Sequence, residues 1–193
     1  MDLAGFVGSL TLADGALVVL FALAFIMGYS QGVLQQLLEL GAFLASFVLA
    51  ANLRLPVGAW LSAYWTNVPG EFSFMIAFLA SFVILLGVAT LAILVYYKRT
   101  ELSSRYIVAD EIAGGVLATL IVMLIVGTLV LATDGYYGAV GRNPGGADVG
   151  WLRSLHDVLD GAALVHFLRD NLVPGLLTVL GPLLPDAVRA LTP

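Results

Sequence analysis

Long uncharged apolar stretches alternate with short polar breaks along the first two-thirds of the chain. The runs Phe72–Tyr97 and Ile112–Thr133 contain no charged residue. Each is long enough to cross a bilayer, because about 20 apolar residues suffice. The earlier apolar stretch, 15–53, would be about 60 Å long as one straight helix, roughly twice the hydrocarbon thickness. It must therefore contain a break.

The most polar and glycine-rich part of that stretch is residues 28–32, Gly-Tyr-Ser-Gln-Gly. We predict a tight helical hairpin here, because backbone groups freed at such a turn need water or neighbouring protein. Together with the two later runs, the pattern predicts an all-α fold. Residues 1–134 are expected to form a polytopic membrane helix bundle of four transmembrane helices, near residues 12–28, 33–53, 72–97 and 112–133.

The segment 54–71 separates the second predicted span from the third. It contains Trp60, Tyr64 and Trp65, and aromatic rings of this kind favour the headgroup layer of a membrane. We expect a loop on the membrane surface, with a short helix at most.

The remainder, residues 135–193, has a different pattern. Residues 143–146 (Asn-Pro-Gly-Gly) are a strong turn signal, and apolar residues then recur at helical spacing over 151–159. Three prolines divide the rest of the tail. We predict a Gly/Pro-rich turn and short amphipathic C-terminal helices that lie on the membrane or against the bundle. A fifth span over 172–184 is not expected, because this stretch is short and contains two prolines.

Composition supports a membrane protein and narrows its partners. Hydrophobic residues make up 61% and charged residues 11% of the 193 residues, against about 45–50% and 25% in soluble domains. The lipid bilayer is therefore the natural solvent. The net charge of -5 argues against nucleic acid as a partner, since nucleic acid favours clustered Lys and Arg. The absence of cysteine excludes disulfides, thiolate zinc sites and cysteine nucleophiles.

Basic residues in short loops predict the orientation of the spans. Lys98, Arg99 and Arg105 lie between the third and fourth predicted spans, and loops rich in Lys and Arg tend to stay cytoplasmic. With four spans, both termini are then expected to be extracytoplasmic in a multi-pass protein of the cell membrane.

Small residues recur at spacings that allow helices to approach closely in lipid. Gly28 and Gly32 form a G-x-x-x-G pair, which is also consistent with a turn that needs glycine. Gly114 and Ala118 form a second small-xxx-small pair, next to Gly115, at the start of the fourth span. We expect all five residues to serve helix packing.

A few polar residues are candidates for a site in or near the bundle. Asp14 and Asp110 lie at predicted helix starts, where a carboxylate suits the exposed N–H groups, so capping is favoured. Glu39 lies inside the second predicted helix, one turn after Gln35 and on the same face. It is expected either to form a polar site inside the bundle or to lie at the membrane interface.

The tail offers weak candidates for chemistry. His156 and Asp160, and likewise His166 and Asp170, are four residues apart, so each pair shares one helix face. Two ligands make a poor metal site, and we predict a solvated helix face with no metal and no cofactor. Ser154 has no G-x-S-x-G elbow around it, so hydrolysis by this chain is not expected.

Several of these motifs together resemble those of the colicin V production protein (CvpA) family. They are Asp14, the Gly28-x-x-x-Gly32 turn, Asp110 followed by Gly114-Gly115, and Trp151-x-x-Ser154. The resemblance covers nearly the whole chain and implies a four-span inner-membrane protein linked to colicin export and envelope stress tolerance. One departure is the neutral turn, where relatives often have a basic residue.

The sequence thus favours a non-enzymatic scaffold or accessory factor in envelope homeostasis or secretion. Its expected partners are another copy of the chain or a membrane or extracytoplasmic protein. The alternative is a small oligomeric channel or transporter with Gln35 and Glu39 lining the pathway. A membrane-bound enzyme comes third, because the sequence supplies no nucleophile–base pair.

Overall fold

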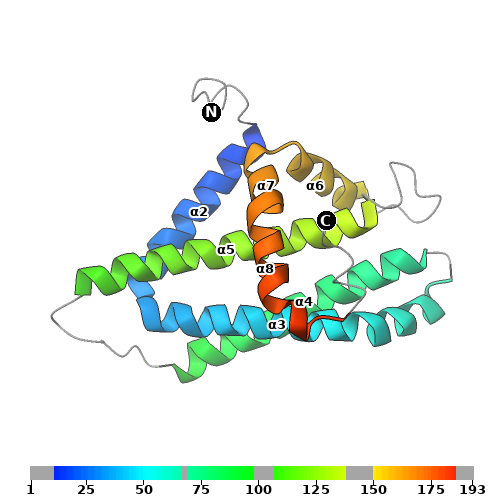
Figure 1. Cartoon of the computed structure of the whole chain (residues 1–193), viewed down its shortest axis with the longest axis horizontal. Coiled ribbons are helices and arrows are strands. Elements are labelled where there is room, and N and C mark those ends of the chain that lie inside the picture. The colour runs from blue at the N-terminus through cyan, green and yellow to red at the C-terminus, as the bar shows by residue number, and fades with distance from the viewer. Residues whose placement is uncertain (1–10, 67–68, 98–106, 138–149, 186–193) are drawn as a thin grey trace.

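A computed structural model describes residues 11–66, 69–97, 107–137 and 150–185 (Figure 1). All regular elements within these ranges are helical, which confirms the all-α prediction. In chain order they are α2 (Leu12–Gln31), α3 (Val33–Tyr64), α4 (Gly70–Tyr96), α5 (Ile107–Tyr137), α6 (Gly150–Asp160), α7 (Ala163–Phe167), the π-helical η1 (Leu168–Leu172), α8 (Val173–Leu180) and the 3-10 segment η2 (Gly181–Leu183).

Five helices within the described ranges are long and apolar enough to cross a membrane. Four of them are α2, α3, α4 and α5, which overlap the four predicted spans, and the fifth is the tail helix over Ala163–Leu183. The chain is therefore a polytopic membrane helix bundle. The predicted turn at 143–146, the basic residues of the loop after α4 and both chain ends lie outside the described residues.

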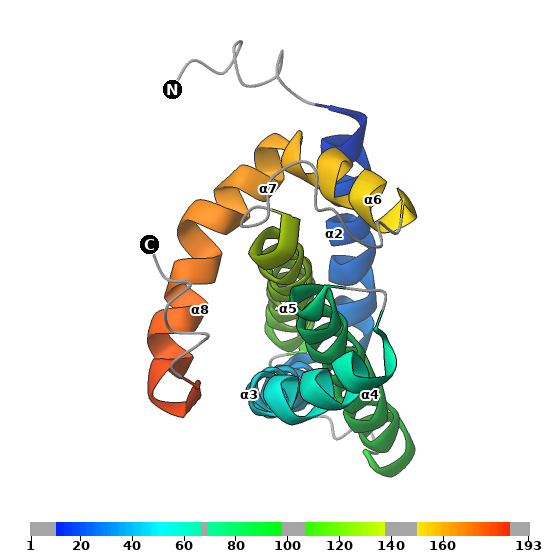
Figure 2. The same cartoon turned by 90° about the vertical axis from the view of Figure 1, so that its right-hand side faces the viewer.

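The helices pair in an order that differs from their order in the sequence. α3 packs mainly on α4, whereas α2 packs mainly on α5. α2 and α3 meet at Gly32 and then diverge in both views (Figures 1 and 2). The predicted tight hairpin is therefore wrong in its packing, although its turn lies where the sequence placed it. The reason is that the buried stripe of α2, which includes Leu17, Phe21 and Ala24, faces α5 and the tail instead of α3.

The expected surface loop after residue 53 is mostly helix. α3 continues without interruption to Tyr64, with Pro56 inside it. Proline lacks the N–H for the usual helical bond and disfavours a helix interior, yet packing on α4 holds this turn in place. The backbone of Gly58 lies directly against the Phe74 ring, where a Cβ would collide with it. This tertiary contact overrides the local signal of the proline.

The apolar core of the described residues has three parts, and each of them joins helices far apart in the sequence. In the largest, the rings of Phe43 and Phe47 on α3 pack on Phe78 and Phe82 on α4. The Phe43–Phe82 and Phe47–Phe78 pairs are edge-to-face with centroids 5.7 Å apart, a favoured aromatic geometry. A second cluster joins α2, α5 and α7, and a third packs the end of α5 under Leu152 of α6.

The tail forms a longer helix than its prolines suggested. α7, η1, α8 and η2 follow one another without a break over Ala163–Leu183, and they cross the bundle next to α5 (Figures 1 and 2). Pro174 is the second residue of α8, just after the π-helical η1, and Pro182 is the second residue of the 3-10 segment η2, so the helix type changes near each proline while the segments stay contiguous. The short C-terminal helices that the sequence predicts are present, but they are contiguous and together form a fifth candidate span over Ala163–Leu183. The four-span count itself stays a prediction.

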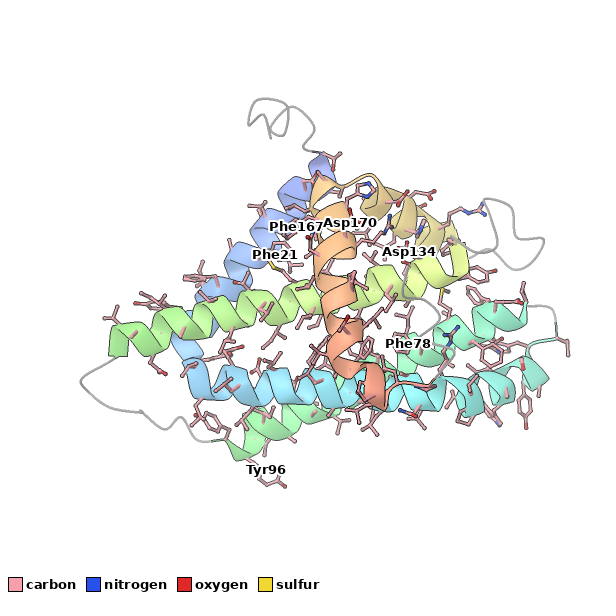
Figure 3. The ribbon with its side chains drawn as sticks, in the orientation of Figure 1. Phe21, Phe78, Tyr96, Asp134, Phe167 and Asp170 are labelled. Atoms are coloured by element: carbon pink, nitrogen blue, oxygen red, sulfur yellow. The ribbon has the colours of Figure 1, made fainter. Side chains whose placement is uncertain are left out.

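Much of the bundle exterior is apolar. Only 11% of the most apolar window of α4 is buried within the chain, and Val83, Val88 and Val95 are exposed. Tyr96, at the end of α4, points away from the bundle with 85% of its surface accessible (Figure 3). An exterior of this kind is suited to hydrocarbon, where helices bury their own backbone polar groups and present apolar side chains outward.

Candidate functional site

The crossing of α2 and α5 brings together the small residues singled out in the sequence. A Cβ on Gly28 would lie 2.5 Å from the carbonyl oxygen of Gly114 and closer still to the Cβ of Ala118. In return, a Cβ on Gly114 would lie 2.6 Å from the Gly28 carbonyl oxygen. Gly115 faces the Phe25 ring at 2.8 Å by the same measure. The two backbones are thus in direct contact, which only small residues permit.

Asp110 lies beside this crossing and caps a helix other than its own. It belongs to the first turn of α5, but its Oδ1 accepts a hydrogen bond of 3.2 Å from the backbone N–H of Val33, the first residue of α3. The turn residue Gly32 has φ +84°, and a Cβ there would lie 2.6 Å from the Asp110 carboxylate. Glycine is therefore suited to this position for two reasons: it adopts the positive φ without strain, and its lack of a Cβ leaves room for the Asp110 carboxylate.

The polar residues after the turn bond to one another. The Gln35 side-chain amide donates to the Glu39 carboxylate at 3.1 Å, one turn along α3. Gln35 is buried and Glu39 is half-buried. The neighbouring Gln36, also buried, donates its amide to Gln31 at the end of α2. The start of α3 is therefore polar toward the chain interior.

Asp14 joins the start of α2 to the start of α7. Its Oδ2 accepts from the Thr11 N–H at 2.8 Å and from the Thr11 hydroxyl at 2.9 Å, which forms a capping box at the start of α2. Its Oδ1 accepts from the N–H of Leu164, in the first turn of α7, at 2.8 Å. The carboxylate is fully buried. One side chain thus caps two helices.

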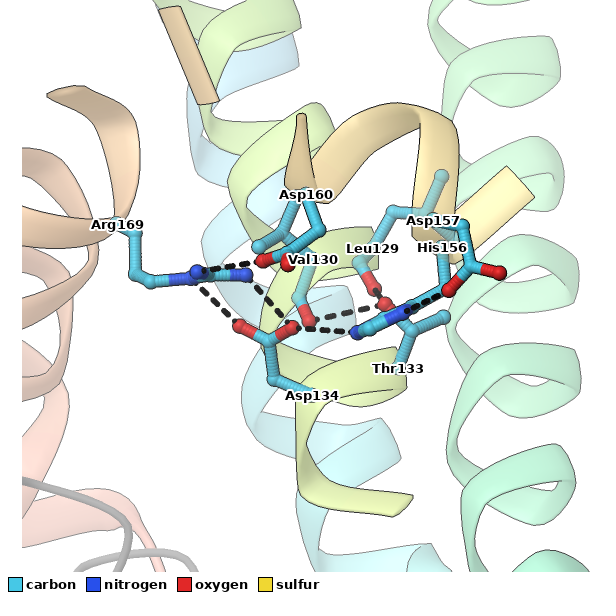
Figure 4. Close-up of polar contacts among 8 residues, drawn as sticks. All are labelled: Leu129, Val130, Thr133, Asp134, His156, Asp157, Asp160 and Arg169. Carbon is cyan, nitrogen blue, oxygen red and sulfur yellow. Dashed lines mark hydrogen bonds and ion pairs between the residues drawn. The ribbon is translucent and has the colours of Figure 1, made fainter. Parts of the chain in front are cut away.

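A cluster of four charged and polar side chains fastens the tail to α5 (Figure 4). Arg169 of η1 reaches both carboxylate oxygens of Asp134 on α5, each at 2.8 Å. A third nitrogen of the same guanidinium donates to Asp160 of α6 at 2.9 Å. His156 of α6 lies 3.1 Å from the Asp134 carboxylate. We call these four residues the Asp134 cluster; its two-pronged Arg–carboxylate contact is among the stronger polar contacts.

A family profile described as colicin V production protein matches residues 13–154, well over half of the sequence. The chain belongs to the colicin V production protein family. No curated protein and no solved structure matches it significantly.

The family match covers the α2–α5 crossing but only part of the Asp134 cluster. Gly28, Gly114 and Asp110 lie inside the matched range, as does Asp134. The partners of Asp134 on the tail lie after residue 154. In this member of the colicin V production protein family, a carboxylate within the matched region is therefore the anchor for helices that follow it.

Ser154 lies apart from both polar groups. It is exposed on α6, and its hydroxyl donates to the carbonyl of Gly150 in its own helix at 2.9 Å. His166 and Asp170 are exposed on the tail. Within the described ranges, no group of three or more His, Cys, Asp and Glu side chains is placed to hold a metal.

Asp134 and Arg169 were not predicted from the sequence as site residues. Each is an ionisable residue within or directly after an apolar helical pattern, and such residues are expensive in a membrane unless they are paired. That rule was the available signal, because an arginine amid Leu164, Leu168 and Leu172 needs an acidic partner on a neighbouring helix. Sequence order alone does not say which helix supplies it.

Acid should weaken the Asp134 cluster, because it protonates the Asp160 carboxylate. The hydrogen bond from Arg169 holds the pKa of the Asp160 carboxyl below its usual value of 3.8. The depressed pKa means that this carboxylate stabilises the fold above about pH 4 and loses its contribution as the pH falls through the folded-state pKa. We expect D160N to lower the melting temperature at pH 7 and to reduce the loss of stability between pH 5 and pH 3.

The measurement is thermal unfolding of the purified protein in detergent, followed by circular dichroism across this pH range. The matched control is D157N on the same helix, since Asp157 is largely exposed and makes only a 3.5 Å contact with His156. Identical pH profiles for D160N and the unaltered protein would contradict the expectation.

Proposed function

We propose that this member of the colicin V production protein family is a non-enzymatic scaffold or accessory factor for secretion and envelope homeostasis. Its proposed place is the prokaryotic cell membrane, with both termini extracytoplasmic. The family description supports a link to colicin V production. The basic loop between the predicted third and fourth spans supports the orientation.

The proposal rests on one observation: three aspartate side chains bond to other parts of the chain. Asp14 caps α2 and α7, Asp110 caps α3, and Asp134 holds Arg169. Each carboxylate is bonded to another part of the chain instead of converging with the others on one cavity. A chain whose carboxylates join its helices is suited to hold a fixed shape for partners.

The proposed partners are the surrounding lipid, a second copy of the chain or a membrane or extracytoplasmic protein. Nucleic acid is not proposed as a partner, because the net charge is -5. Among the five candidate spans of the described residues, α4 has the smallest buried share, so its exposed apolar side chains are available for such contacts.

The proposal is tested by reconstituting the purified full chain into liposomes. We expect no flux of ions or of a trapped small dye above that of empty liposomes, and no turnover of peptide or ester substrates. Flux or turnover that depends on the protein would overturn the scaffold role.

Single cysteines placed at Ser9, Ser103 and Thr192 test the orientation, since the chain has none of its own. Labelling of a cysteine at position 103 from the extracytoplasmic side would overturn the proposed orientation.

The channel or transporter alternative makes a different prediction. It requires a pathway lined by Gln35 and Glu39, which hydrogen-bond to each other in the structure. If the liposomes did conduct, E39A would test this assignment. Unchanged flux in E39A would remove Glu39 from the pathway.

A further inference from the structure

A pocket opens where the later part of α3, the start of α4 and the end of α5 meet. It holds about 550 Å³ of space outside the protein atoms, part of it open to the exterior. Its walls are mainly apolar, and only two lining side chains carry a charge. The lining residues are Phe47 and Arg54 of α3; Glu71, Met75 and Phe78 of α4; and Leu131, Ala132, Gly135 and Tyr136 of α5.

The two charged residues of this pocket have no partner in the described part of the chain. Arg54 is half-buried, and its guanidinium makes no hydrogen bond or ion pair there. Glu71, exposed at the start of α4, is likewise unpaired. Elsewhere the chain pairs such groups, as it does for Arg169 with Asp134. A half-buried cation in a membrane helix that has no partner among the described residues is suited to bind an anionic group of a ligand.

The depth of the pocket points to the lipid headgroup layer. On α3, Arg54 is followed by Trp60, Tyr64 and Trp65, all of which are exposed, and such rings favour the membrane interface. In the other direction, Phe47 lies about two turns away and belongs to the buried aromatic core. The charged end of the pocket therefore lies nearer the interface, and the apolar end lies deeper.

We propose that this pocket binds a zwitterionic phospholipid. Arg54 takes the phosphate, since guanidinium and phosphate form strong charge-assisted hydrogen bonds. Glu71 faces the ammonium of an ethanolamine headgroup, and the first part of an acyl chain lies along Phe47, Met75 and Phe78. The opposite charges of the two side chains match the ethanolamine headgroup, which carries both charges. They match phosphatidylglycerol less well, because its headgroup carries only a negative charge. The inference is independent of the scaffold role.

The test is native mass spectrometry of the purified full chain in detergent, titrated with defined lipids. The probes are phosphatidylethanolamine and phosphatidylglycerol with the same acyl chains, glycerophosphoethanolamine as the headgroup alone, and oleate as an anionic chain alone. We expect phosphatidylethanolamine to bind most tightly and the headgroup alone not to bind. Equal or tighter binding of phosphatidylglycerol would overturn the zwitterionic assignment. Equal binding of oleate would overturn phospholipid as the occupant.

Three variants locate the binding. R54Q should weaken binding of phosphatidylethanolamine by roughly tenfold or more, as expected for loss of a charge-assisted bond. E71Q should bring the ratio of the two phospholipid affinities to about one, a change of a few-fold that is typical of an exposed charge. G135L should also weaken binding roughly tenfold, because its side chain would occupy the pocket. A Cβ at Gly135 meets nothing within 4 Å, so the first atom of the new side chain is accommodated, and the variant keeps both charges.

The matched control is G41L, at an open position on α3 that does not line the pocket. It should bind both phospholipids as the unaltered protein does. Circular dichroism and melting temperatures identify variants that fold. If R54Q and G135L both bind phosphatidylethanolamine within twofold of the unaltered protein, the pocket is not the site and the proposal is overturned.

Discussion

G28L is expected to separate α2 from α5 and to destabilise the bundle by about 3 kcal/mol, at the upper end of the usual cost of overpacking. The added Cβ alone would collide with the Ala118 side chain and approach the Gly114 carbonyl oxygen to 2.5 Å. Neither atom can move aside by itself, because the Cβ of Ala118 is fixed to the α5 backbone and the Gly114 carbonyl is part of it. The helices must therefore move apart, which loses the close packing that holds helices together in lipid.

The measurement is the melting temperature of the purified protein in detergent, followed by circular dichroism. G41L is the matched control, because a Cβ at this α3 glycine meets nothing within 4 Å. Leucine favours helix over glycine by several tenths of a kcal/mol, so the control should melt at the same or a higher temperature. If G28L melted together with G41L, the close crossing of α2 and α5 would be refuted.

D14A is expected to cost about 3 kcal/mol and to release the start of α7. The Asp14 carboxylate accepts hydrogen bonds from Thr11 and Leu164. Hydrogen bonds to a charged group contribute about 1.5–3 kcal/mol each, and a buried N–H left unpaired adds its desolvation penalty. Alanine removes the Asp14 half of the α2 capping box and the cap of α7 at once, which is why the expected effect exceeds the loss of an ordinary N-cap, about 1 kcal/mol.

Hydrogen exchange at the backbone amide of Leu164 reads out this effect directly. The amide should exchange slowly in the unaltered protein and much faster in D14A, together with its neighbours in α7. D170A is the matched control, since Asp170 is an exposed acidic residue of the same tail that has no partner in the described part of the chain. Slow exchange at Leu164 in D14A would show that Asp14 does not hold the tail.

The sequence predicted the helices well where the signal was local. An uncharged run such as Phe72–Tyr97 must be a helix in lipid, because its backbone polar groups have no other partner. The errors arose where a tertiary contact decided the outcome. Pro56 suggested a loop, but Gly58 packs on Phe74 and α3 continues.

The pairing of helices could not be predicted from the sequence. Small residues at Gly28 and Gly114 indicate that some helix approaches closely, but they do not name the partner. For the same reason, carboxylates at helix starts were recognisable as caps while their targets were not. Asp14 caps its own helix and a second one, whereas Asp110 caps α3 from α5. Asp134 and Arg169 find each other only once the tail crosses α5.

The bond between Asp14 and Leu164 also bears on the order in which the protein is completed. Its two partners are 150 residues apart in the chain. At a synthesis rate of about 5–20 residues per second, Asp14 exists for roughly 8 to 30 s before Leu164 is made. During that interval only Oδ2 of Asp14 has its partner, which is Thr11, while the partner of Oδ1 does not yet exist. The Asp14 contacts at the start of α2 are thus completed only after α7 has been synthesised.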